Sequence, residues 1–126
     1  RVGRDRMYHE QILEHYRDPL NFGLLDHPTY QREEWNPTCG DKFTFSVHVT
    51  ETGTIDQVGF NGEGCAISTA AASLLSEAIK GKSLSEVLEL KPDFVLNLLS
   101  IDLGPTRLKC ALLPLQAITH LTSPQS

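Results

Sequence analysis

The residues best suited to chemistry in this chain are its three cysteines and one nearby aspartate. Cys39 lies two residues before Asp41, Cys65 follows a Gly-Glu-Gly sequence, and Cys110 follows Arg-Leu-Lys. Three thiolates and one carboxylate match the four ligands of a tetrahedral zinc ion or of one iron in a cluster. No two of these cysteines form a Cys-x-x-Cys pair. Spacing alone therefore leaves a second interpretation open, in which three unrelated buried cysteines act as small hydrophobic residues.

The local sequence around each cysteine favours a functional site. Cys65 is expected at the start of a helix, where backbone N–H groups and the helix dipole favour a thiolate over a thiol. A thiolate is the form that binds metals and attacks sulfur electrophiles. Cys110 is expected at a helix start too, with Pro114 in the first turn, where a missing N–H is harmless. Cys39 precedes Gly40 and lies between two predicted strands. Each of the three cysteines therefore lies at the boundary of a predicted element rather than in an apolar stripe.

The bulk properties narrow the class of protein. A chain of 126 residues with 40% hydrophobic and 21% charged residues is typical of one globular domain, spanning 1–126. A net charge of −5 argues against a general nucleic-acid surface. No apolar run is long enough to cross a membrane and no apolar signal core begins the chain, so a cytoplasmic location is expected. An odd number of cysteines also argues against a closed disulfide framework and favours a metal or thiol site.

The hydrophobic periodicity predicts an α+β fold with a three-stranded antiparallel sheet and helices packed mainly on one face. The predicted strands are 30–35, 42–50 and 54–60, and the predicted helices are 5–18, 66–80, 84–90, a short one from Pro92, and 109–120. A loop is predicted at 101–106, between the last two helices. In the second strand Phe43, Phe45, Val47 and Val49 should face the core, while Lys42, Thr44, Ser46, His48 and Thr50 should face water. His48 is then expected to be solvated rather than a ligand.

The motifs around the cysteines resemble those of the NifU/IscU/SufU scaffold proteins of iron–sulfur cluster assembly. The resemblance rests on Asn-Pro-Thr-Cys-Gly-Asp at 36–41, Gly-Glu-Gly-Cys-Ala-Ile-Ser at 62–68 and Arg-Leu-Lys-Cys at 107–110, and it covers nearly the whole chain in order. It implies the SufE/NifU-like α+β fold and a surface site of Cys39, Asp41, Cys65 and Cys110. That site would hold Zn²⁺ or a 2Fe-2S cluster at the same residues. Asp41 would be a hard oxygen ligand among soft sulfurs, which suits a site that must release its cargo.

Within the family the chain resembles the SufU branch most. Members of the IscU type have a histidine before the third cysteine, whereas Lys109 precedes Cys110 here. SufU proteins resemble zinc-bound sulfur acceptors more than stable cluster scaffolds. SufU members usually carry an insertion before the third cysteine, but 101–104 runs almost directly into Pro105. Contacts made by that insertion are therefore not implied for this chain.

The resemblance also implies partners and roles. The chain would accept sulfur from a cysteine desulfurase of the SufS or IscS type and pass sulfur or a cluster to downstream acceptor proteins. It would be a scaffold or a zinc-dependent, sulfurtransferase-like acceptor rather than a turnover enzyme. We expect the first persulfide on Cys110, because the preceding loop should move and Lys109 should keep the freed thiol ionised.

Two other functions compete with this interpretation. The first is a structural zinc domain, in which the metal only stabilises the fold. Removal of zinc would unfold such a domain. The second is a cysteine hydrolase, which needs one activated thiol and a nearby histidine. No histidine adjoins any of the cysteines in the sequence, which argues against the hydrolase.

Overall fold

The computed structural model describes residues 2–37, 40–99 and 105–121, with side chains described for 10–37, 40–99 and 108–121. The elements in chain order are α1 (Val2–Arg17), β1 (Tyr30–Trp35), β2 (Lys42–Val49), β3 (Ile55–Glu63), α2 (Ala66–Ala78), α3 (Leu84–Leu88), α4 (Pro92–Leu99) and α5 (Pro105–Thr119). Within these ranges no helix is both long and apolar enough to cross a membrane.

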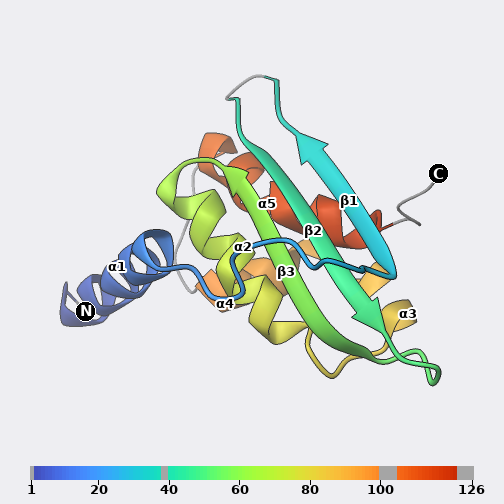
Figure 1. The fold of residues 1–126 in the computed structure, drawn as a ribbon. Coiled ribbons are helices and arrows are strands. Elements are labelled where there is room, and N and C mark those ends of the chain that lie inside the picture. The colour runs from blue at the N-terminus through green and yellow to red at the C-terminus, as the bar shows by residue number, and fades with distance from the viewer. Residues whose placement is uncertain (1, 38–39, 100–104, 122–126) are drawn as a thin grey trace.

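The three strands form one antiparallel sheet in the order β1-β2-β3, with helices α2, α4 and α5 behind it (Figure 1). Phe45 of β2 pairs with Arg32 of β1 and Phe60 of β3. The fully buried core joins the sheet to α2 and α5 through Phe43, Phe45, Phe60, Leu75, Ile79 and Ile118. The predicted α+β class with helices on one face is therefore confirmed.

The opposite face of the sheet is covered by the connector between α1 and β1, residues 18–29, which crosses β3 and β2 in Figure 1. The backbone N–H of Gly23 donates to the Phe60 carbonyl at 2.6 Å, and the Leu25 N–H donates to Ser46 Oγ at 3.0 Å. A Cβ atom on Gly59 would collide with the Gly23 carbonyl, so a glycine permits this close approach.

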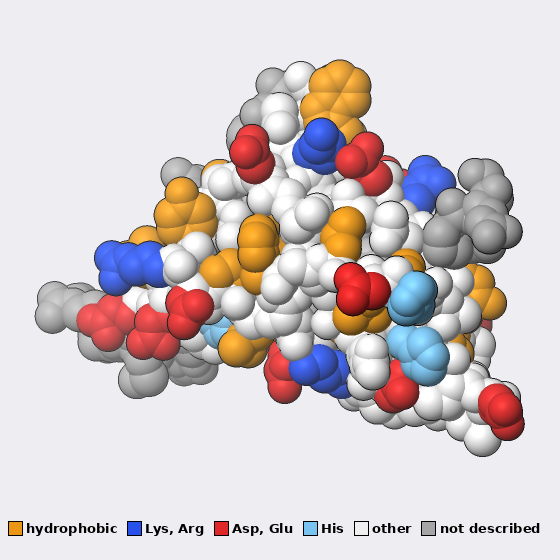
Figure 2. Space-filling view, viewed as in Figure 1, with side chains coloured by type: hydrophobic (Ala, Val, Ile, Leu, Met, Phe, Trp, Pro, Cys, Tyr) orange, Lys and Arg blue, Asp and Glu red, His pale blue; other side chains and the backbone are white. Residues whose placement is uncertain are grey.

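This cover corrects the prediction that every second residue of β2 faces water. Ser46 is 0% exposed, because the connector lies over it, and Thr44, whose hydroxyl contacts Glu33, is 8% exposed. His48, nearer the end of the strand, is half-exposed as predicted, and its Nδ1 is hydrogen-bonded to Asp56 Oδ1 at 2.6 Å. Around the connector, Figure 2 shows apolar, acidic and basic side chains interspersed rather than gathered by kind.

Several element boundaries differ from the predictions. Helix α1 begins at Val2 rather than near residue 5, and β3 continues through Glu63 instead of ending at Phe60. The sequence Ser-Leu-Ser-Glu at 83–86 predicts a capped helix start, and Ser83 Oγ does accept from the Glu86 N–H at 3.2 Å. Residues 101–104 of the predicted loop at 101–106 lie outside the described residues. Its last two residues, 105 and 106, are helical.

Helix α5 shows the largest difference in a functional region. It begins at Pro105, not Lys109, so Cys110 lies inside the helix and Pro114 is an interior proline. Pro105 suits the first helical position, because its ring fixes a helical φ and its missing N–H is not needed there. The cost of Pro114 is offset by apolar burial on the same helix, where Leu113 and Ile118 are 3% and 0% exposed. The prediction of Cys110 at a helix start is wrong.

Candidate metal centre

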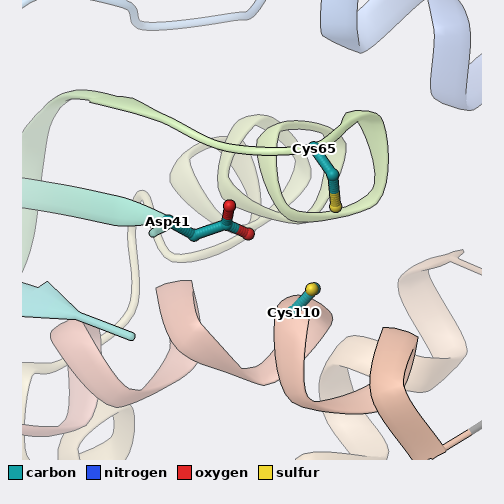
Figure 3. A group of neighbouring side chains, drawn as sticks. All are labelled: Asp41, Cys65 and Cys110. Carbon is teal, nitrogen blue, oxygen red and sulfur yellow. The ribbon is translucent and has the colours of Figure 1, made fainter. Parts of the chain in front are cut away.

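Three of the four predicted ligands lie together at one end of the sheet. Asp41 comes from the residue before β2, Cys65 from the residue before α2, and Cys110 from α5 (Figure 3). One oxygen of Asp41 and the two sulfur atoms all lie within 4.8 Å of one another. The fourth predicted ligand, Cys39, lies outside the described residues. Its part in the site therefore stays a prediction.

Asp41 is placed by the turn between β1 and β2. The Asn36 N–H donates to the Asp41 carbonyl at 2.8 Å, and the Gly40 N–H donates to the Asn36 carbonyl at 2.8 Å. Gly40 has a φ of +81°, a conformation that favours glycine. The Asp41 residue is 6% exposed, which is unusual for a carboxylate without a partner. Its partner is Ser68, whose Oγ donates to Asp41 Oδ2 at 3.1 Å.

Cys65 caps the N-terminus of α2, as the sequence predicted. Its backbone is extended, and its sulfur accepts from the Ser68 N–H at 3.5 Å. The preceding residue, Gly64, packs tightly: a Cβ there would meet Ser68 Oγ and the Phe43 ring. Cys65 is half-buried, so of the two described sulfurs it is the one partly open to solvent. Its position at a helix start between strand and helix is confirmed.

Cys110 approaches from the opposite side of the group, on α5 (Figure 3). It is 7% exposed, while the neighbouring Lys109 is exposed. Cys65 and Cys110 are not joined to each other by a disulfide. The cysteine positions thus combine one partly open sulfur with one that the fold buries.

The chemistry of this donor set fits zinc or iron. Bonds of about 2.0–2.3 Å to a tetrahedral zinc ion place its ligand atoms roughly 3.3–3.8 Å apart. Ligand atoms within 4.8 Å of one another are close to that spacing. Two sulfurs among three donors favour zinc or iron over calcium or magnesium, which prefer oxygen ligands. The group can therefore hold a metal ion.

The histidines with described partners bond elsewhere. His15 contacts Ser73, His48 contacts Asp56 and His120 contacts Glu34. Among the described side chains, no histidine joins the Asp41, Cys65 and Cys110 group. The arrangement thus lacks the nearby base that the cysteine-hydrolase interpretation requires.

Sequence reasoning missed Ser68 as a member of this site. Its backbone N–H contacts one donor and its hydroxyl contacts another. The signal was available, because a residue three positions after a helix N-cap supplies the N–H that the cap accepts. The part that a single sequence does not show is that Asp41, 27 positions earlier, reaches the same hydroxyl.

The chain resembles known proteins in both sequence and fold. Residues 7–122 match the family model described as the NifU-like N terminal domain. The zinc-dependent sulfurtransferase SufU of Bacillus subtilis is 34% identical and covers 90% of this chain, which spans 88% of that protein. The iron-sulfur cluster assembly scaffold protein IscU of Haemophilus influenzae is 31% identical, with 88% of this chain and 89% of that protein covered.

A crystal structure supports the same grouping. An iron-sulfur cluster assembly scaffold protein for the SUF system from Fervidobacterium islandicum superposes with a TM-score of 0.73 at 26% identity. The match covers 86% of this chain and 91% of that chain. Sequence and fold therefore point to one group of relatives, whose names carry both zinc and iron–sulfur chemistry.

Proposed function

This chain belongs to the family of NifU-like N-terminal domains, and we propose that it is an iron–sulfur cluster assembly scaffold that accepts sulfur from a cysteine desulfurase. The proposed site is Cys39, Asp41, Cys65 and Cys110, where sulfur or a cluster is assembled or relayed. One observation carries the proposal: Asp41, Cys65 and Cys110 converge from three separate elements onto one group of donors. A protein that needed three core cysteines would not require a buried carboxylate among them.

These residues suit two kinds of occupant. Zn²⁺ would be held by the cysteines with Asp41, and when bound it would keep the thiolates ionised and fixed in position. A 2Fe-2S cluster is cargo, assembled on the same residues and then released. Asp41 is the harder donor of the set, so it is the ligand expected to bind iron least firmly.

Cys110 is the proposed sulfur acceptor. Its thiolate attacks the outer sulfur of the desulfurase persulfide, and a new S–S bond forms on Cys110. The bond between that sulfur and the desulfurase cysteine breaks, and the electron pair leaves with the desulfurase thiolate. No external oxidant or reductant is needed.

Cys110 is 7% exposed, so its sulfur has to become accessible, and we propose that a shift of α5 exposes it. Pro114 lies four residues after Cys110 and has no N–H to donate to the Cys110 carbonyl. The helix is therefore weaker at Cys110 than a helix without proline would be. Lys109 is exposed and precedes Cys110 in the chain, so we expect its positive charge to favour the ionised thiol once Cys110 is exposed.

The proposed partners follow from this chemistry. The sulfur donor is a pyridoxal-phosphate cysteine desulfurase of the SufS or IscS type, and the recipients are downstream iron–sulfur proteins. The proposed location is the cytoplasm, where a reducing environment keeps such thiols free.

The test is mass spectrometry of each cysteine after brief incubation with a cysteine desulfurase and cysteine. We expect the first persulfide on Cys110 and little label in Cys110→Ser. Label on Cys39 or Cys65 of Cys110→Ser, at the parent's rate, would overturn the assignment of Cys110. A parent that takes up no persulfide, and that unfolds when zinc is removed, would favour a structural zinc domain instead.

A further inference from the structure

We propose that Ser68 is a positioning residue of the metal centre, which holds the Asp41 carboxylate beside Cys65 and Cys110. The inference rests on the proposed metal site and deepens it. Ser68 is fully buried in the first turn of α2, so its hydroxyl must satisfy its hydrogen bonds inside the protein.

The hydroxyl of Ser68 has a choice of acceptors. Its Oγ lies 3.1 Å from Asp41 Oδ2, 3.1 Å from the Cys65 carbonyl and 3.6 Å from Cys65 Sγ. A serine hydroxyl carries one proton, and a bond to a charged carboxylate is stronger than one to a neutral carbonyl. The Ser68 hydroxyl therefore donates its proton to Asp41 Oδ2. Because a carboxylate has two oxygens, Asp41 can accept this bond at one and keep the other for a metal.

The backbone of Ser68 serves a second donor of the same group. Its N–H donates to Cys65 Sγ at 3.5 Å. One residue thus contacts two donors that arrive from different elements, the turn before β2 and the start of α2. Outer-shell hydrogen bonds of this kind fix the orientation of ligands before the metal binds.

Two other buried serines on α2 show that this role belongs to a position and not to serine alone. Ser73 and Ser76 are also 0% exposed, but their hydroxyls bond to the segment 15–21 and not to the donor group. An alanine at Ser73 therefore removes a buried hydroxyl from the same helix without touching the site. It is the matched control for an alanine at Ser68.

The experiment measures zinc affinity of metal-free protein by competition with a chromophoric chelator. Ser68→Ala should bind zinc about 10–100-fold more weakly than the parent, the usual loss when an outer-shell partner is removed. Ser73→Ala should bind as the parent does. Ser68→Thr keeps the hydroxyl and should recover most of the lost affinity.

A double-mutant cycle with Asp41→Ala separates positioning from packing. If Ser68 acts through the carboxylate, Ser68→Ala should cost no further affinity in the Asp41→Ala background. An equal loss in both backgrounds, or parent-like affinity of Ser68→Ala, would overturn the inference while leaving the metal site intact. A parent that binds no zinc would overturn the site and the inference together.

A second measurement covers the case in which Ser68→Ala fails to fold. The Ser68 hydroxyl proton of the metal-free parent should exchange slowly with water and be visible by NMR. It should exchange faster in Asp41→Ala, because its charged acceptor is gone. An equal exchange rate in the two proteins would overturn the inference.

Discussion

Helix α2 presents buried hydroxyls to two different regions of the molecule. In its first turn Ser68 bonds to Asp41, within the donor group. Farther along, Ser73 accepts from the Leu20 N–H at 2.8 Å and contacts His15 Nδ1 at 2.7 Å, which joins α1 and the connector to the core. The contacts in the first region fix the positions of groups that can bind metal. The contacts in the second region only hold α1 and the connector against the core. The same helix therefore separates function from stability, and substitutions in the two regions should have separable effects.

The largest effect is expected from removing a ligand. Cys65→Ser replaces a thiolate with a hydroxyl, a much poorer zinc ligand, and should weaken zinc binding by more than about 100-fold, beyond the loss for an outer-shell partner. Chelator competition measures the affinity, with Ser73→Ala as the control that keeps the donor group. Parent-like affinity in Cys65→Ser would show that the site is wrongly placed.

A change in the second region should move stability instead. Ser73→Ala leaves the Leu20 N–H and His15 without their buried partner and should lower the free energy of unfolding by about 1–3 kcal/mol. Urea unfolding measures this, with zinc content per chain determined on the same samples. Lost zinc in a folded Ser73→Ala protein would contradict the separation of the two regions.

Asp41→Ala should have a smaller effect, and it should lengthen rather than shorten the lifetime of a bound cluster. It removes the hard oxygen and leaves the sulfurs, so a cluster built anaerobically should decay a few-fold more slowly than on the parent. The decay is followed by visible absorbance after addition of an iron chelator. Faster decay than in the parent would count against Asp41 as the ligand that eases release.

The smallest effect is expected at the outer edge of the second region. A hydrogen bond from Asn21 Nδ2 at 3.0 Å, followed by Lys80, holds the pKa of Glu77 below its usual range. Because that pKa is lower in the folded chain, the bond stabilises the fold above the unfolded pKa. The stabilisation is lost as the pH falls through the folded value. Asn21→Ala should raise the pKa of Glu77 in an NMR titration, and an unchanged value would exclude Asn21 as the main cause.

Much of the fold could be predicted because local signals agreed with the global arrangement. Alternation in β2 and the N-cap at Ser83 both specify their elements locally. The burial of Ser46 could not be predicted, because the connector that covers it lies about 20 residues earlier and has no periodic pattern of its own. Pro114 misled the prediction of α5, because tertiary packing outweighed a local rule against interior proline.

The donor group also has one part that the local sequence predicts and another that depends on tertiary packing. The cap at Cys65 has a local sequence signal, a glycine-rich turn before a helical pattern. The approach of Cys110 to Asp41 depends on how α5 packs on α2 and the sheet, which no local pattern contains. Ser68 was missed for the same reason, since its acceptor arrives from another element.

X-ray absorption spectroscopy of the zinc-loaded protein tests the central claim most directly, because it reports the atoms bound to the metal. A site of Cys39, Asp41, Cys65 and Cys110 predicts three sulfurs at about 2.3 Å and one oxygen at about 2.0–2.2 Å. Zinc surrounded only by nitrogen and oxygen, in a protein with its thiols reduced, would contradict the account.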